Sequence, residues 1–205
     1  MNRAISILPM ACFLGLLSAP GLGQSTPQPM VLKETGHVMV GDRQVPYLIR
    51  RLPTSSFPQL PVAVREVLDQ RGCMIPQTYQ AHRPENVVRA SLQRAGSVDW
   101  AVLCATHGNV ALLVFFASAL DQPIQLASAE ETTRLQPHDP SGILGFNWGI
   151  DPASPGKVHD AQAGMEQRTA PLDHDALADS VIDQRTVFHY YNGQQWTVLN
   201  GQQMQ

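Results

Sequence analysis

The stretch LDHDALADSVID at residues 172–183 places four aspartates and one histidine within twelve positions. Carboxylates beside a histidine can bind a metal ion or act as an acid and base in catalysis. The stretch lacks the central glycine and the final glutamate of an EF-hand calcium loop. His174 also has no second histidine at the close spacing that a zinc site requires. No specific metal-binding motif is therefore present.

The spacing of these aspartates favours the exposed face of a helix over residues 174–182. The aspartates that would share one face are Asp175, Asp179 and Asp183. The apolar residues would lie on the opposite face, and Asp173 would cap the N-terminus. We therefore expect a solvated helix, with little change in melting temperature when millimolar calcium is added. A weak cation site and a catalytic use with His174 are the alternatives.

A second candidate is the GFNWG segment at residues 145–149, where two aromatic residues stand between glycines. Such rings could form a platform for a sugar or a peptide. Alternatively they fill the hydrophobic core, and this interpretation is favoured. The candidate binding residues are Phe146, Trp148, Asp173, His174, Asp175 and Asp179. No catalytic residue, metal ligand or cofactor site is predicted, and a G-x-S-x-G nucleophile elbow is absent.

The charge distribution argues against a nucleic-acid partner. Residues 24–120 carry nine basic and six acidic side chains, whereas residues 121–183 carry three basic and eleven acidic side chains. The chain has a formal net charge of −3. Nucleic-acid binding requires clustered lysine and arginine, and no such cluster is present.

The N-terminus has the pattern of a secretory signal peptide over residues 1–23. One arginine precedes an apolar run, and small residues then suit a cleavage site between Gly23 and Gln24. A lipid anchor at Cys12 is the disfavoured alternative, because Pro9 stands where an aliphatic residue is needed. No later stretch reaches the roughly 20 apolar residues of a membrane span. We expect a secreted or periplasmic protein.

Two cysteines follow the signal segment, Cys73 and Cys104. An even number of cysteines in an exported chain favours a disulfide over a reactive thiolate or a zinc site. The predicted helix ending at Gly72 would bring Cys73 onto the sheet face that carries Cys104. We therefore predict that the two are joined.

The hydrophobic pattern predicts a flexible tail over 24–30 and a single α+β domain over 31–205. An antiparallel meander at 87–118 would be flanked by helices at 61–71 and 154–165. The chain would end in a β-hairpin with a two-residue Asn-Gly turn, which pairs His189 with Trp196.

Three blocks of the sequence carry a family resemblance. They are GCMIPQ (72–77), ENVVRASLQRAGSVDWAVLC (85–104) with LLVFF (112–116), and a block at 173–196. Together they resemble a group of uncharacterised exported bacterial proteins with no assigned activity. The resemblance implies an exported bacterial domain and nothing about chemistry.

These observations lead to two hypotheses of function. The first is a non-enzymatic binding or envelope-associated domain, whose partner would be a protein or glycan of the envelope. The second is a hydrolase-like or metal-assisted enzyme that uses the acidic cluster 173–183 with His174. A structure distinguishes the two hypotheses. In an enzyme the carboxylates must converge on one pocket, whereas on a solvated helix they point outward.

Overall fold

The computed structural model describes residues 31–201. The predicted signal peptide over 1–23, its cleavage after Gly23, the tail over 24–30 and the alternative lipid anchor at Cys12 lie outside these residues.

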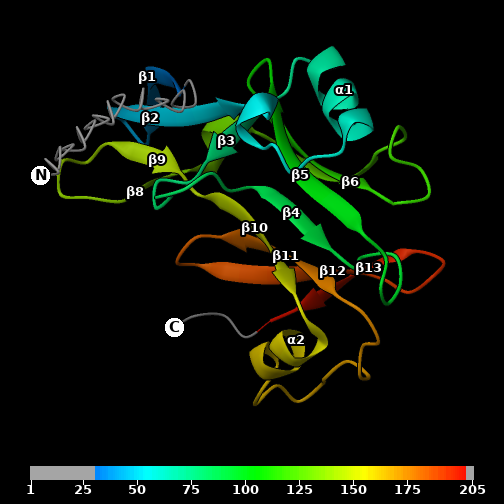
Figure 1. Ribbon diagram of the computed structural model, residues 1–205. Coiled ribbons are helices and arrows are strands. Elements are labelled where there is room, and N and C mark those ends of the chain that lie inside the picture. The colour runs from blue at the N-terminus through cyan, green and yellow to red at the C-terminus, as the bar shows by residue number, and fades with distance from the viewer. Residues whose placement is uncertain (1–30, 202–205) are drawn as a thin grey trace, which may run out of the picture.

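Two β-sheets make up most of the described chain (Figure 1). The strands of the first sheet are β1 (Leu32–Val40), β2 (Arg43–Pro53), β3 (Met74–Gln77), β4 (Val87–Ala90), β5 (Asp99–Thr106), β6 (Asn109–Phe115), β7 (Ile124–Glu130), β8 (Leu135–Pro137) and β9 (Leu144–Phe146). Their order is β7-β6-β5-β3-β2-β9-β8, with β1 paired to β2 and β4 paired to β5. The β2–β9 pair is parallel, and the other pairs are antiparallel.

The second sheet is antiparallel and contains the C-terminal part of the chain. Its strands, in order, are β10 (Trp148–Ala153), β11 (Ala176–Val181), β12 (Arg185–Tyr191) and β13 (Trp196–Asn200). The helices are α1 (Val62–Gln70) and α2 (Pro155–Ala161), with 3-10 turns at Thr54–Ser56 and Glu131–Arg134. In Figure 1 the second sheet lies below the first, and α2 lies below the second sheet.

The main core lies between the two sheets. Its buried side chains include Ile49, Leu103, Leu112, Phe146, Trp148, Ile150 and Leu177. The other face of β5 is covered by α1, whose fully buried Val64 and Leu68 belong to the same cluster as Trp100, Val102 and Cys104 of β5. Both faces of β5 are therefore buried, which explains why its sequence shows no alternation between apolar and polar residues.

The predicted disulfide is present in this second core. Cys73 follows the end of α1 and is joined to Cys104 of β5, with the two Cα atoms 5.1 Å apart. The bond links the end of the helix to the middle of the first sheet.

The predicted α+β class is wrong. The fold is β-rich, with 47% strand and 13% helix, and two helices among the described residues. The helix predicted at 61–71 is present as α1, and β4, β5 and β6 are antiparallel neighbours as predicted for 87–118. They belong, however, to a nine-stranded sheet. Within residues 124–153, β9 pairs with the distant β2 and β10 pairs with the distant β11, and local patterns do not reveal such pairing.

The predicted helix at 174–182 is also wrong, because residues 176–181 form β11. This strand pairs with β10 on one side and β12 on the other. Its first half is buried on both faces, because Leu177 lies in the main core and Ala176 and Ala178 lie in a smaller core with Val158 of α2. The helix predicted at 154–165 is shorter and ends at Ala161. Ser154 caps its N-terminus by accepting a hydrogen bond from the backbone of Lys157.

The C-terminal hairpin is present, but its predicted register is wrong. His189 pairs with Val198, and Trp196 pairs with Tyr191. The turn contains four residues because the Asn192 side chain accepts hydrogen bonds from the backbone N–H groups of Gln194 and Gln195. This side-chain interaction stabilises a wider turn than the two-residue form that Asn-Gly favours.

Candidate functional site

The six residues predicted as binding candidates lie in three environments: Asp173 with His174, Asp175 beside Ser91, and Asp179 beside Trp148, which lies in the core with Phe146. At the first, Asp173 is exposed while the side chain of His174 is 4% exposed. An oxygen of Asp173 lies 2.6 Å from His174 Nδ1 and accepts a 2.7 Å hydrogen bond from the Tyr190 hydroxyl. The bonds from Tyr190 and His174 hold the pKa of the Asp173 carboxyl below its usual value.

Asp175, which precedes β11, and Asp179 of β11 have structural partners of their own. The Asp175 carboxylate accepts a 3.0 Å hydrogen bond from the backbone of Ser91, which connects β11 to the end of β4. Asp179 lies between Trp148 Nε1, at 2.7 Å, and His189 Nε2, at 2.9 Å. These carboxylates therefore fix strands and rings in place.

Phe146 and Trp148 are core residues, with exposed fractions of 1% and 0%. The Arg134 guanidinium covers the Trp148 ring, with its central carbon 4.2 Å from the ring centroid. Neither ring is presented to solvent as a platform. Within residues 31–201, moreover, no three His, Cys, Asp or Glu side chains converge as metal ligands would.

The last aspartate of the stretch, Asp183, belongs to a pocket. This open cavity of about 470 Å³ is lined by Tyr79, Gln80, Gln136, Pro137, His138, Asp183 and Gln184. Three segments supply the walls, namely the loop after β3, the end of β8 and the turn between β11 and β12. We take this polar pocket as the candidate site for a polar ligand, because hydrogen bonds tie its side chains to one another.

Hydrogen bonds join the walls of the polar pocket. The Tyr79 hydroxyl donates to Asp183 at 2.6 Å, and the Gln80 amide donates to the same carboxylate oxygen at 3.1 Å. Gln136 donates to the Tyr79 hydroxyl at 2.7 Å and accepts from the Gln184 amide at 2.7 Å. The side chains are thus held in place before a ligand arrives, which lowers the entropic cost of binding.

The aromatic part of the polar pocket depends on a glycine. The rings of Tyr79 and His138 stack with centroids 4.9 Å apart. A Cβ atom on Gly145 would lie 2.6 Å from Tyr79 Cβ and 2.7 Å from His138 Cδ2, so a larger residue would displace the stacked rings.

Asp183 has a φ of 58°, which is unusual for a residue other than glycine. Sparsely populated backbone conformations of this kind concentrate at functional sites.

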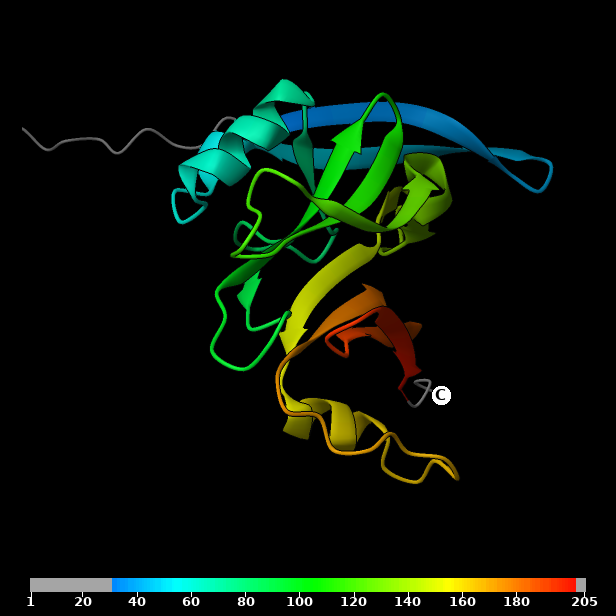
Figure 2. The same ribbon diagram turned by 90° about the vertical axis from the view of Figure 1, so that its right-hand side faces the viewer.

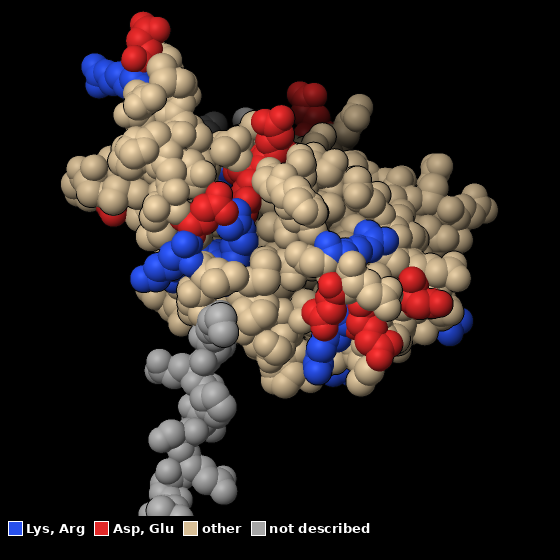
Figure 3. All heavy atoms as spheres, turned by 90° about the horizontal axis from the view of Figure 1, so that it is seen from above, with Lys and Arg blue, Asp and Glu red and all other residues tan. Residues whose placement is uncertain are grey.

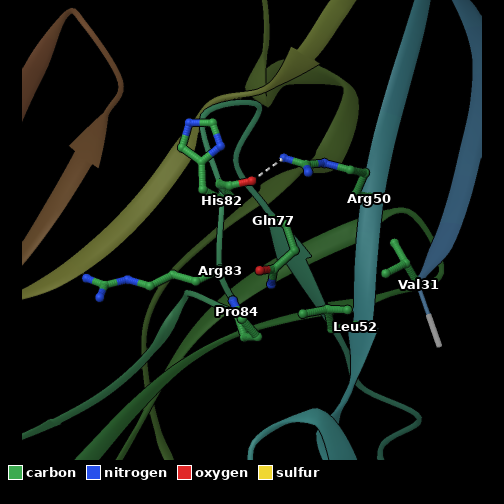
Figure 4. Close-up of a pocket in the computed structure, with 8 residues that line it drawn as sticks. Val31, Arg50, Leu52, Gln77, His82, Arg83 and Pro84 are labelled. Atoms are coloured by element: carbon green, nitrogen blue, oxygen red, sulfur yellow. Dashed lines mark hydrogen bonds between the residues drawn. The ribbon is translucent and has the colours of Figure 1, made fainter. Parts of the chain in front are cut away.

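The loop that carries Tyr79 is anchored by the partly buried Arg50 and the buried Gln77. Arg50 of β2 donates hydrogen bonds to the carbonyls of Thr78 at 2.7 Å and Ala81 at 3.1 Å, and the dashed line in Figure 4 marks the second of these. Gln77 donates to the Glu85 carbonyl and accepts from the Glu85 N–H, which closes the base of the loop. The smaller cavity in Figure 4, about 160 Å³, lies beside this anchor.

We predict that Asp183 controls the ionisation of Tyr79. Burial and the hydrogen bond to Asp183 raise the pKa of Tyr79. Asp183→Asn removes the negative acceptor, so the pKa of Tyr79 should fall while burial still holds it above the usual value. The measurement is a titration of phenolate absorbance, with Tyr79→Phe to assign the transition. An unchanged titration in Asp183→Asn would contradict the described hydrogen bond.

The same interaction has a consequence for stability. A tyrosine whose pKa is raised on folding stabilises the protein fully below its unfolded pKa of about 10. This contribution is lost as the pH rises through the folded pKa of Tyr79.

The surface and the helices give little further indication of function. On the face shown in Figure 3, acidic and basic side chains are interspersed rather than gathered by sign. Neither helix within residues 31–201 has the length and apolar character needed to cross a bilayer.

A scan against protein-family models finds no match, and searches of curated proteins and of solved structures find no significant match.

Most residues of the polar pocket were not predicted from the sequence. Asp183 lay within the acidic stretch but was assigned to a helix face, and Tyr79, Gln136 and His138 were not singled out. A usable signal was the pair Asp183-Gln184 between two apolar segments. A turn between two strands at Asp183-Gln184 would lie at the end of a sheet, and binding residues are often carried by such loops.

Proposed function

We propose that this protein is an exported bacterial domain that binds a polar ligand in the pocket around Tyr79 and Asp183, without catalysing a reaction. The observation that supports this most strongly is the polar pocket itself, whose walls are joined by hydrogen bonds across three segments. The disulfide and the signal-like segment at 1–23 support export to the periplasm or the medium. The three sequence blocks that resemble exported bacterial proteins point the same way.

The side chains of the polar pocket suit hydroxyl and amine groups of a glycan of the envelope. Asp183 offers a carboxylate, and Gln80 and Gln184 offer amides, all of which can bond sugar hydroxyls. His138 and Tyr79 add aromatic surface, against which the C–H face of a sugar ring can pack. An envelope glycan is therefore favoured over an apolar ligand.

A binding role is favoured over hydrolysis by the placement of the carboxylates. Glycoside hydrolysis by the usual route needs two carboxyl groups on either side of the scissile bond. Among the residues that line the polar pocket, Asp183 alone carries a carboxylate. Asp173, Asp175 and Asp179 interact with Tyr190, Ser91 and Trp148 instead. His174, the histidine of the enzymatic hypothesis, is likewise not among the lining residues.

The proposed function is tested by heteronuclear NMR titration with N-acetylglucosamine, its tetramer and soluble peptidoglycan fragments. Chemical-shift changes should concentrate at the backbone amides of Tyr79, Gln80, His138, Asp183 and Gln184. The variant Asp183→Ala should lose most of these changes, because it removes the charged acceptor of the polar pocket. The matched control is Asp121→Ala, which removes an exposed aspartate that does not line the polar pocket.

Shift changes confined to other surfaces, or identical titrations for wild type and Asp183→Ala, would rule out this site. Slow conversion of any of these glycans by the purified protein would instead favour an enzyme.

A further inference from the structure

The hairpin of β1 and β2 extends away from the rest of the fold (Figure 2). Among the described strands, β1 pairs with β2 alone, through all nine of its residues. Its outer edge therefore presents unpaired backbone N–H and C=O groups over the length of the strand. Such an edge is a template for pairing with another chain unless charges, proline or a bulge block it.

The outer edge of β1 has few such protective features. Eight large apolar side chains are exposed in the described part of the chain, and four belong to β1 or the residue before it. These are Val31, Leu32, Met39 and Val40. Lys33 and Glu34 are the charged residues of the strand, and it contains no proline. Between Tyr47 and the turn, the hairpin has two strands only, because β3 and β9 pair with the later part of β2. Two-stranded hairpins are marginally stable in water, so a further strand would stabilise this projecting part.

The other open edges are less suited to pairing. The outer strand β7 faces a register shift at Leu112 and Leu113 of β6, and irregularities of this kind twist an edge away from partners. The outer strand β13 is five residues long, whereas β1 has nine. The remaining edge strands β4, β8 and β10 have four, three and six residues. The β1 edge is therefore the longest regular edge among the described strands.

Pro46 shows which backbone groups of β1 point outward. Pro46 lies opposite His37 and has no N–H, so this cannot be a pair that exchanges two hydrogen bonds. The backbone groups of His37, and of alternate residues on either side, therefore face the open edge. These residues are Lys33, Thr35, His37 and Met39.

We propose that this edge pairs with β1 of a second copy of the chain, antiparallel about a two-fold axis at Gly36. In that register Lys33 lies opposite the partner subunit's Met39, and Thr35 lies opposite the partner subunit's His37. All four outward-facing residues then find a partner. No like charges lie directly opposite each other, which is the arrangement that stabilises a strand pair. The self-complementary register is the reason to favour a second copy over an unrelated peptide.

Gly36 suits the centre of such an interface. The Tyr47 ring covers this glycine on one face, since a Cβ atom there would lie 2.6 Å from the Tyr47 hydroxyl oxygen. An aromatic ring over an edge glycine stabilises strand pairing. This interface uses none of the residues that line the polar pocket, so it stands independently of the proposed function.

The test is the mass of the purified full chain, exported with its disulfide intact, by sedimentation equilibrium over increasing concentration. We expect a monomer–dimer equilibrium. His37→Pro removes an outward N–H and leaves the β1–β2 hydrogen bonds in place, so it should weaken dimerisation by about tenfold or more. His37→Ala keeps the N–H and is the matched control. Circular dichroism of both variants shows whether the fold is retained.

A second measurement tests the register even if His37→Pro fails to fold. Glu34→Cys and Val38→Cys proteins, mixed and oxidised, should form a crosslinked mixed dimer, because these residues face each other across the proposed axis. Each variant alone should crosslink poorly. A monomer at every concentration, a dimer unaffected by His37→Pro, or crosslinking equal in the mixture and the single variants would overturn the proposal.

Discussion

Removing the disulfide by the double substitution Cys73→Ala with Cys104→Ala is expected to lower the free energy of unfolding by roughly 3.5–4 kcal/mol. The cysteines are 31 residues apart, and the bond restricts this loop in the unfolded chain. Both residues are buried between α1 and β5, so some packing is lost as well. A typical domain is stable by about 5–15 kcal/mol, which makes this a large share. Chemical denaturation of the wild type and the double variant measures the difference.

Two controls accompany this prediction. Reduction of the wild type should give a similar loss, because it breaks the same covalent link without changing side-chain volume. Mass spectrometry after alkylation without reduction should find neither Cys73 nor Cys104 modified. Two alkylated cysteines, or equal stability of the oxidised and reduced protein, would show that the bond does not form in solution.

The variant Asp99→Ala is expected to destabilise the protein by about 3–5 kcal/mol, because it leaves several buried donors without an acceptor. Asp99 is 0% exposed. Its carboxylate accepts hydrogen bonds from the backbone N–H groups of Leu92, Gln93 and Ala117, and from the Ser97 hydroxyl. Thermal and denaturant unfolding give the loss.

The variant Asp99→Asn separates the effect of losing hydrogen bonds from the effect of losing side-chain volume. The asparagine side chain has a similar size and keeps one acceptor oxygen. The stability of Asp99→Asn should therefore lie between those of the wild type and Asp99→Ala. The exposed Asp121→Ala is the surface control and should change stability by less than about 0.5 kcal/mol. A loss for Asp99→Ala no larger than that for Asp121→Ala would refute the assigned role.

Local sequence patterns predicted the elements whose signals are local. The helix α1 has an apolar stripe, and Gly72 with a φ of 68° follows its end. The strands β5 and β6 are continuous apolar runs separated by turn residues. The disulfide followed from the cysteine count and from the position of Cys73 at the end of the helix.

The acidic stretch was misassigned because its aspartates have partners that are distant in the sequence. Asp179 accepts from Trp148 and lies beside His189, and Asp183 accepts from Tyr79. The Asp179 side chain is 12% exposed, and Asp183 is exposed but bonded to Tyr79. In the sequence alone, neither can be told from an unpartnered aspartate on a helix surface. Spacing at i and i+4 therefore favoured a helix although the residues form a strand.

The polar pocket could not be predicted for a related reason. Its walls come from Tyr79, Gln136 and Asp183, which meet because β8 and β9 join the first sheet through the parallel β2–β9 pair. A parallel pair depends on a long crossover connection, and hydrophobic periodicity does not specify its partner. The residues themselves are ordinary polar side chains, so position alone makes them a site.

The central claim, a ligand site at Asp183, is tested most directly by retention from envelope extract on immobilised protein. Wild type, Asp183→Ala and the control Asp121→Ala are each exposed to periplasmic extract and culture medium. Bound carbohydrate is then eluted and identified by mass spectrometry. The account predicts a glycan retained by wild type and Asp121→Ala and lost from Asp183→Ala. Equal retention by all three proteins, or no glycan on any of them, would contradict it.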